Sequence, residues 1–360
     1  MKFKSILNES PATKTDLQEY VKKYQPPDIR RSIWQIANSV IPYFVVWYLM
    51  YSSLSVSYWL TLLLALLASG LTMRIFIILH DCGHGSFFKS ASANHVVGTI
   101  CGILTQTPYF QWTRVHAIHH SSSGDLGRRG VGDVTTLTVK EYLALSFWER
   151  AQYRFYRNML VMLLIGPNYL FIWTHRFVGK HSGRRERNNV YLTNAALFTI
   201  WAILCLTVGV KAFLLIMIPI NVIAGAAGVW LFYIQHQFEN TYWQQPANWD
   251  YATAAILGSS YYKLPKVLQW FSGNIGFHHI HHLSPKIPNY RLERCHNEML
   301  LFKQVTVMRF WESLKSASLK LWDEEQQRLV GFRHLRSPGG RGDCDLTKPL
   351  ACDKMDKNRA

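Results

Sequence analysis

The sequence predicts an all-α integral membrane protein, with four transmembrane helices in two hairpins, additional interfacial helices and a cytoplasmic cap. Three observations support this fold class. The chain has 360 residues, of which 49% are hydrophobic and 17% charged, and its mean hydropathy of −0.01 is high for a chain with that charge content. The apolar residues gather in runs of about 20 residues, the length that crosses a bilayer. Nearly all basic residues lie outside those runs.

The four predicted spans form two pairs, each joined by a short connector. The stretch "SSLSVS" separates the first two, and a minimal connector around Lys211 separates the last two. Arg74 interrupts the second span near its end, where a long side chain can reach the interface. Two hairpins leave the large polar segments on one side of the membrane. The predicted spans are residues 33–51, 58–79, 190–210 and 212–235.

The distribution of basic residues predicts which side that is. Of 39 Lys and Arg residues, all but Arg74 and Lys211 lie before residue 33, between residues 80 and 189, or after residue 235. The positive-inside rule then places both termini and the central loop in the cytoplasm. A net charge of +17 can also indicate nucleic-acid binding. Here the charges flank apolar spans, so we expect anionic lipid headgroups and no nucleic acid as the partner.

The domain organisation follows from these spans. Residues 1–32 form an N-terminal amphipathic segment, expected at the membrane surface on the cytoplasmic side. Residues 33–331 form the membrane domain with its cap. The polar stretch 332–360 contains Gly and Pro and is expected to be disordered.

Three further stretches need an assignment. Residues 96–109 and 159–173 are apolar but short for a span, which favours interfacial or re-entrant helices. If either crossed the membrane alone, the histidine clusters described next would lie on opposite faces. Residues 305–330 show helical periodicity, which predicts a helix packed under the membrane domain.

Histidines form three clusters next to the spans. "HDCGH" places two histidines at i and i+4, whereas "HAIHH" and "HHIHH" each place three at i, i+3 and i+4. Residues at these spacings share one face of a helix. His279 falls at i+1, off that face, and is left out of the predicted set. The clustered residues are His80, His84, His116, His119, His120, His278, His281 and His282.

Clustered imidazoles predict metal binding, because a neutral histidine is the commonest metal ligand. A lone histidine is usually a surface or hydrogen-bonded residue, but three clusters with matched helical spacing make that interpretation a poor one. Eight ligands are too many for one zinc ion, so two metals are implied. Imidazole ligands suit iron, copper, zinc or nickel alike. His236, at the end of the last apolar run, is a candidate ninth ligand, although a histidine there could simply interact with the helix dipole.

The three boxes resemble the histidine boxes of the membrane fatty acid desaturase family. "HDCGHGSFF" and "HQFENTYW" look like the acyl-lipid branch, whose members introduce a second double bond near the middle of an acyl chain. Membrane alkane hydroxylases, carotenoid ketolases and sphingolipid desaturases carry similar boxes. A di-iron hydroxylase or ketolase acting on an alkyl, sphingolipid or carotenoid substrate is therefore the alternative to a desaturase.

The resemblance implies a non-haem di-iron centre that uses O2 as co-substrate to desaturate a membrane lipid acyl chain. It implies as iron ligands the eight clustered histidines, with His236 as a ninth. The six cysteines show no CxxC pair or iron–sulfur spacing, and no flavin fingerprint is present. An external electron donor, a ferredoxin or a cytochrome with its reductase, must therefore supply the electrons.

Carboxylates and amides near the boxes are candidates to orient the ligands, because a metal-bound imidazole usually donates its other N–H to an oxygen. These candidates are Asp81, Asp133, Glu239 and Asn274.

A non-enzymatic metal transporter is a further alternative to a desaturase. Transporters place their ligands near the bilayer midplane, whereas these histidines lie at or beyond the ends of the spans, which disfavours that function.

Overall fold

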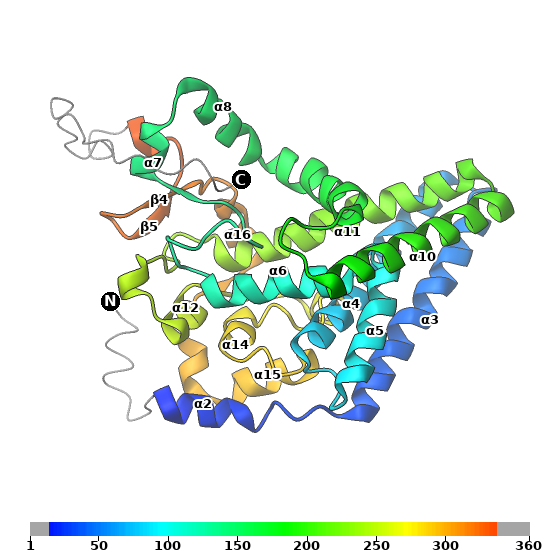
Figure 1. The fold of residues 1–360 in the computed structure, drawn as a ribbon, viewed down its shortest axis with the longest axis horizontal. Helices are drawn as coiled ribbons and strands as arrows, with labels where there is room; N and C mark the ends of the chain where they lie inside the picture. The colour runs from blue at the N-terminus through cyan, green and yellow to red at the C-terminus, as the bar shows by residue number, and fades with distance from the viewer. Residues whose placement is uncertain (1–13, 337–360) are drawn as a thin grey trace.

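The computed structural model describes residues 14–336. Within them, four helices are long and apolar enough to cross a membrane, as the sequence predicts, and they extend to one side of the cap (Figure 1). Each helix is longer than its predicted span, because polar residues extend it beyond the apolar run. They are α3 (Ile29–Ser53), α4 (Tyr58–His84), α10 (Arg184–Val208) and α11 (Val210–His236).

Local sequence signals set the ends of these helices. The Asp28 carboxylate accepts hydrogen bonds from the backbone N–H groups of Arg30 and Arg31, so it caps the start of α3. Gly85 ends α4 in the left-handed conformation, with φ of 66°, which glycine adopts without a steric penalty. The first histidine box lies in the last turns of α4, so the end of the helix at Gly85 fixes the position of that box relative to the bundle.

Helix α4 lies at the centre of the bundle and packs against α3, α11 and α5 (Ala91–Leu104). Its small and β-branched side chains, among them Ala65, Ala68 and Ile75, are fully buried. The Ser69 hydroxyl contacts the Ile220 carbonyl oxygen of α11 at 3.2 Å. This close packing fixes the ends of α4 and α11 relative to each other, and both ends carry histidines.

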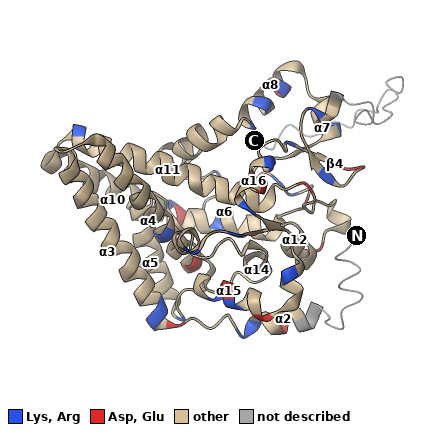
Figure 2. Cartoon of the chain, turned by 180° about the vertical axis from the view of Figure 1, so that it is seen from behind, with Lys and Arg blue, Asp and Glu red and all other residues tan. Residues whose placement is uncertain are grey.

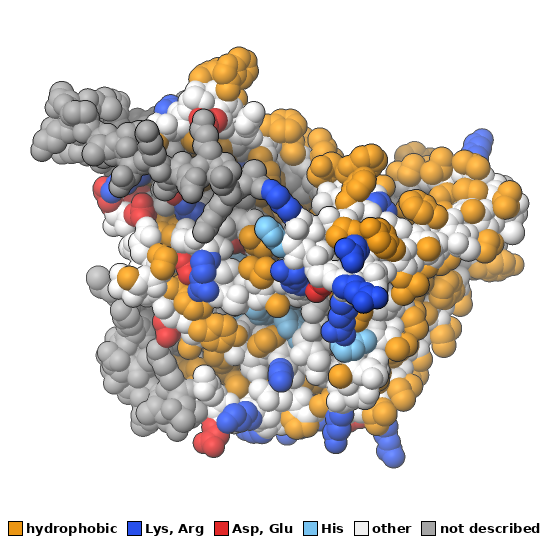
Figure 3. Space-filling view, viewed as in Figure 1, with side chains coloured by type: hydrophobic (Ala, Val, Ile, Leu, Met, Phe, Trp, Pro, Cys, Tyr) orange, Lys and Arg blue, Asp and Glu red, His pale blue; other side chains and the backbone are white. Residues whose placement is uncertain are grey.

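The outer faces of the four helices expose large apolar side chains, such as Phe44, Leu63, Phe198 and Leu206. Figure 3 shows hydrophobic side chains covering the end of the molecule formed by α10 and α11. Figure 2 shows basic residues gathered around the cap and nearly absent from the far half of the bundle. An apolar belt beside a basic cap is the pattern expected of a membrane protein.

Helix α5 corresponds to the first predicted interfacial stretch and does not separate the histidine boxes. It is followed by α6 (Tyr109–Ser122), which returns to the end of α4. The Tyr109 hydroxyl donates a hydrogen bond to the Cys82 carbonyl at 2.8 Å. The first two boxes therefore lie at the same end of the bundle.

The second interfacial stretch, 159–173, is part of a bent pair. Helix α8 (Phe147–Tyr156) and the helical segment Val161–Arg176 meet at 59°. Together they are apolar enough for a broken span or a re-entrant loop, so the described chain has four spans, or five if this pair counts as one. Segment Val161–Arg176 comprises η1 (Val161–Ile165), α9 (Gly166–Asn168), η2 (Tyr169–Trp173) and η3 (Thr174–Arg176).

The cap is built from short elements around the histidine boxes. Its helices are α2 (Lys14–Lys22), α7 (Val139–Ala144), η4 (Pro246–Asn248), α12 (Tyr251–Leu257), α13 (Lys266–Phe271), α14 (His278–Leu283), α15 (Asn289–Glu298), η5 (Leu300–Gln304), α16 (Phe310–Ser316) and η6 (His334–Arg336). Strands β1 (Leu137–Thr138), β4 (Leu321–Asp323) and β5 (Arg328–Val330) form one sheet, in which β1 is parallel and β5 antiparallel to β4. Strands β2 (Tyr261–Tyr262) and β3 (Val307–Met308) form a parallel pair.

The prediction of one helix over residues 305–330 is wrong for the residues after α16, which ends at Ser316. The chain instead forms the β4–β5 hairpin, with Leu321 opposite Val330 and Trp322 opposite Leu329. The Asp323 carboxylate accepts the backbone N–H groups of the turn residues that follow it, which stabilises a turn in place of a helix. Pairing with β1, far away in sequence, completes the sheet.

The predicted N-terminal amphipathic helix is present as α2, but its apolar face packs on protein. Leu17 and Val21 are 2% and 3% exposed and belong to one core with residues of α14 and α15. This helix therefore covers the third histidine box, and its apolar face is not available to the lipid surface on which we expected it.

Of the predicted 332–360 tail, residues up to 336 are described, and Phe332 packs against the core around Tyr142. The remainder of the tail lies outside the described residues.

Candidate metal centre

Four helices bring the nine predicted histidines together. The C-terminal ends of α4 and α11 supply His80, His84 and His236, while α6 and α14 supply the second and third boxes. Because α4 packs against both α6 and α11, and α14 shares a core with α2, the four helices hold their imidazoles from different directions. The histidines converge where the bundle meets the cap.

The nine side chains separate into two groups, in each of which one ligand atom per residue lies within 4.8 Å of all the others. Two of the three boxes contribute to both groups. The first group is His80, His84, His116, His120 and His281; the second is His119, His236, His278 and His282. His279, which the helical spacing left out of the predicted set, belongs to neither group.

Several imidazole nitrogens point at one another at distances that suit a shared cation. In the first group, His281 Nε2 lies 3.0 Å from His80 Nε2 and 2.9 Å from His120 Nε2, which in turn lies 3.1 Å from His116 Nε2. A ring nitrogen either donates through its proton or accepts on its lone pair, so ordinary N–H···N hydrogen bonds account for at most two of these three contacts. A metal with bonds of about 2.1 Å to ligands at right angles would place neighbouring nitrogens about 3.0 Å apart.

The second group shows the same signs. His278 Nε2 lies 2.9 Å from His236 Nε2. His282 Nε2 and both ring nitrogens of His119 are buried without a hydrogen-bond partner among the described residues. Buried polar atoms without partners are rare in native proteins. Their clustering here indicates that the donor set of each group fits a metal ion.

The electrostatics of the site favour metal binding over protonation. Burial lowers the pKa of His116, His120 and His281 well below the ordinary value, and repulsion from neighbouring histidines lowers each pKa further. The pKa values of His119 and His282 in the second group shift in the same direction for the same reasons. These imidazoles are therefore neutral near pH 7, with lone pairs available for a metal.

Two oxygen acceptors orient two of the nine histidines. Asp81, predicted for this role, accepts a hydrogen bond from His80 Nδ1 at 3.0 Å, so the Nε2 atom of His80 faces the first group. The Gly258 carbonyl, which sequence reasoning missed, lies 3.0 Å from His236 Nδ1. Such bonds fix both the ring orientation and the position of the ring proton.

The other three candidates do not hydrogen-bond to the nine histidines. Asp133 lines a small cavity together with His119 and His236, and burial raises its pKa to about 6. Glu239 is exposed and pairs with Arg328. Asn274 adopts a φ of 58° and donates to the Asn289 carbonyl, so it shapes the loop before α14.

His279 makes a contact that the spacing did not predict. Its Nε2 lies 3.2 Å from Nδ1 of His296, on α15, and both side chains are buried. No sequence signal identified His296, because it stands alone in "RCHNE".

Comparison with known proteins identifies a family. Residues 56–304 match the model of the fatty acid desaturase family. A fatty acid desaturase of Bacillus subtilis is 48% identical over 320 residues, which cover 89% of this chain and 91% of that protein. More distant relatives include the sn-1 oleoyl-lipid 12-desaturase of Synechocystis, 27% identical over 62% of this chain and 64% of its own length. Another is an Arabidopsis thaliana chloroplastic sn-2 acyl-lipid omega-3 desaturase (ferredoxin), 28% identical over 80% of this chain and 69% of its own length.

Proposed function

This chain belongs to the fatty acid desaturase family of enzymes, and we propose that it introduces a cis double bond into an acyl chain of a membrane lipid. The observation that carries the proposal is the pair of histidine groups at the end of an apolar helical bundle. The reaction converts two neighbouring methylene groups to a double bond and reduces one O2 to two waters. Its balance requires two electrons and two protons from outside the substrate.

We propose that each histidine group holds one iron ion. His80, His84, His116, His120 and His281 would hold the first, and His119, His236, His278 and His282 the second. Bound iron supplies the oxygen-activating chemistry that no amino-acid side chain provides. Asymmetric ligand sets of five and four nitrogens would make the two iron positions inequivalent.

The side chains around the two groups position the ligands and limit competing reactions. Asp81 keeps the proton of His80 on Nδ1, so Nε2 presents a lone pair to the first group. The buried positions of His119, His281 and His282 keep bulk water away from the groups. Short helices packed into the core hold these imidazoles, and rigid placement is what a reaction at an unactivated methylene requires.

The acyl-lipid substrate is supported by the location of the site and by two relatives. The groups lie at the end of helices whose outer faces expose apolar side chains, so an acyl chain from the surrounding bilayer can approach them. The Synechocystis relative is named an oleoyl-lipid desaturase, and the Arabidopsis relative an acyl-lipid desaturase that uses ferredoxin. We propose a ferredoxin as the electron donor, by analogy with the Arabidopsis relative, with a cytochrome as the alternative. The distribution of basic residues supports a site and termini on the cytoplasmic side.

The test is analysis of total acyl chains by gas chromatography and mass spectrometry. A host expresses the chain with a matching electron donor, beside a His116→Ala variant that still inserts into the membrane. A new double bond that is absent from the variant supports the proposal and gives the bond position. A new hydroxyl group instead would assign the chain to the hydroxylases, and full desaturation by His116→Ala would remove the second box from the mechanism.

A further inference from the structure

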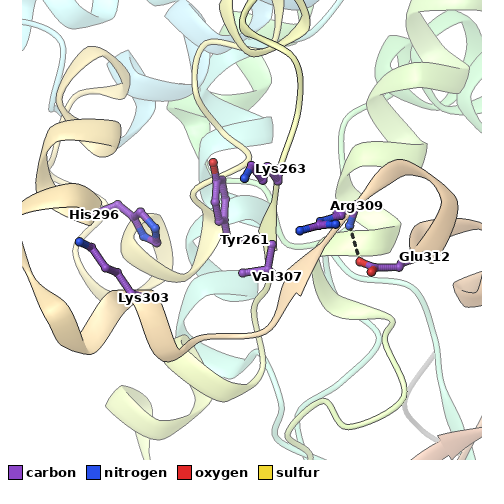
Figure 4. A pocket seen from close by; sticks show the side chains of 7 residues that line it. All are labelled: Tyr261, Lys263, His296, Lys303, Val307, Arg309 and Glu312. Carbon is purple, nitrogen blue, oxygen red and sulfur yellow. Dashed lines mark hydrogen bonds between the residues drawn. The ribbon is translucent and has the colours of Figure 1, made fainter.

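A basic groove opens on the cap beside β2 and β3, and none of the nine histidines of the two groups lines it. It has a volume of about 460 Å³. Figure 4 shows Tyr261 in the middle of its lining, with His296 and Lys303 on one side and Lys263 and Arg309 on the other. The lining thus comes from several short elements between β2 and α16, which together form one concave surface.

The groove carries an excess of positive charge. Lys263, Lys303 and Arg309 are exposed and form no ion pair with any residue in the described part of the chain. One carboxylate, that of Glu312, also lines the groove, and it accepts the backbone N–H of Arg309. Three cations against one anion make this concave surface attractive to an acidic partner.

A chain of contacting rings connects the groove to the proposed metal ligands. Tyr261 stacks on Phe277 with centroids 4.4 Å apart, and His296 lies 4.8 Å from the Tyr261 ring. His296 Nδ1 lies 3.2 Å from His279 Nε2, and His279 is the sequence neighbour of His278 in the second group. The rings in contact, together with the backbone that joins His279 to His278, form a connected route from the groove to the second group.

We propose that this groove is the docking site of an acidic one-electron carrier protein and that His296 and His279 lead its electrons to the second histidine group. The inference rests on the proposed function, since only a redox reaction at that group needs such a path. It gives a role to His279 and His296, two buried histidines that metal binding leaves unexplained.

The surroundings of the groove suit a protein partner. Large apolar side chains close in sequence to the lining residues are exposed, Leu300 to 76% and Trp311 to 77%. Carrier encounters are small interfaces held by modest contacts and steered by charge. A lipid phosphate could satisfy the same cations, but it has no use for a path of rings to the metal ligands.

The electron balance fixes how often the carrier must dock. Each turnover removes two hydrogen atoms from the acyl chain and reduces one O2 to two waters, and it consumes two electrons and two protons. Two reduced carriers each release one electron and leave oxidised, and the protons come from water. The carrier must therefore bind and dissociate twice per double bond, which favours weak, salt-dependent docking.

The first test measures binding without turnover. The probe is an oxidised, acidic [2Fe–2S] ferredoxin, and the target is the enzyme in lipid nanodiscs. We expect Lys303→Glu/Arg309→Glu to raise the Kd at least tenfold at about 10 mM salt, with the difference lost at about 1 M, where charges are screened within about 3 Å. The matched control, Lys140→Glu/Arg333→Glu, reverses two exposed cations outside the groove and should bind like the wild type. Equal binding by both double variants would overturn the proposal.

The second test separates electron delivery from chemistry. The iron-loaded enzyme forms product either with reduced ferredoxin or in one turnover after dithionite reduction. We expect His296→Leu and the groove variant to lose at least tenfold in the ferredoxin-driven rate and nothing in the dithionite-driven yield. A parallel loss in both would show that these residues support the reaction itself and not electron delivery, which would overturn the proposal. If the wild type forms no double bond even after dithionite, the proposed function itself fails, and this inference falls with it.

Discussion

Replacing Asp81 with Asn tests whether the orientation of a single ligand controls metal binding. One Asp81 oxygen accepts from His80 Nδ1 at 3.0 Å, and the other accepts two N–H groups of Asn289, at 2.7 and 2.8 Å. An amide offers one oxygen and one NH2 group. If that oxygen stays with the two Asn289 donors, the NH2 group faces His80.

The consequence is a change in the tautomer of His80. To accept from the new NH2 group, Nδ1 must lose its proton, which moves to Nε2. In the wild type, His80 Nε2 lies 3.0 Å from His281 Nε2 inside the first group, so a proton there removes a ligand. Loss of such an orienting partner costs about 10- to 100-fold in metal affinity, or about 1.4 to 2.8 kcal/mol.

The assay is iron retention per protein during titration with a chelator, followed by the desaturation rate. We expect Asp81→Asn to release iron from one of the two sites at a chelator concentration 10- to 100-fold lower than for the wild type. Asp323→Asn is the matched control, because it breaks a histidine–carboxylate pair with His334 on the hairpin, outside the metal centre. Wild-type iron retention by Asp81→Asn would refute the orientation argument.

Three further predictions follow. His119→Ala and His120→Ala should each leave the protein folded, with about one iron per chain and no activity. Mössbauer spectra of the two variants should differ, because each variant loses a different iron site. Identical spectra would contradict the assignment of the histidines to two groups. In metal-free protein, the folded state keeps the proton of Asp133 between pH 3.8 and about 6, where the unfolded state loses it, so stability falls as pH rises through that window. The free energy of unfolding of Asp133→Asn, relative to that of the wild type, should therefore rise by up to about 3 kcal/mol between pH 4 and pH 7, as measured by thermal unfolding. A relative free energy that stays constant over this pH range would contradict the prediction. Gly98→Ala would place a Cβ 2.3 Å from the Tyr109 ring and should cost about 1–3 kcal/mol of stability. The control, Gly228→Ala, has open space around the new Cβ and should cost no stability. Equal melting temperatures for the two variants would show that α5 and α6 can readjust.

The sequence predicted the features that depend on local pattern. Apolar runs located all four long helices, because lipid imposes the same requirement on every residue of a span. Helical spacing identified the clustered histidines that the structure brings together. A residue at position i lies on the same side of a helix as the residues at i+3 and i+4, wherever that helix lies in the fold. His236 needed its position at a helix end as a further clue.

Features that depend on tertiary contacts could not be predicted. Residues 305–330 have helical periodicity, but pairing of β4 with β1, far away in sequence, overrides it after Ser316. The Gly258 carbonyl and His296 lie beside box histidines only through the folding of loops with no motif. Glu239 is close to His236 in sequence, yet its side chain points to Arg328 in the hairpin.

The division of the histidines between the two groups follows one geometric rule. In every box the i and i+4 histidines belong to the same group; the pairs are His80 with His84, His116 with His120, and His278 with His282. In the two HxxHH boxes the i+3 histidine belongs to the other group. On a helix, residues at i and i+4 are offset by about 40° around the axis, while residues at i+3 and i+4 are about 100° apart. An HxxxH box can therefore serve one group, but an HxxHH box reaches two. Because α6 and α14 each contribute to both groups, these two short helices fix the distance between the groups, and a shift of either helix would disturb both sets of ligands together.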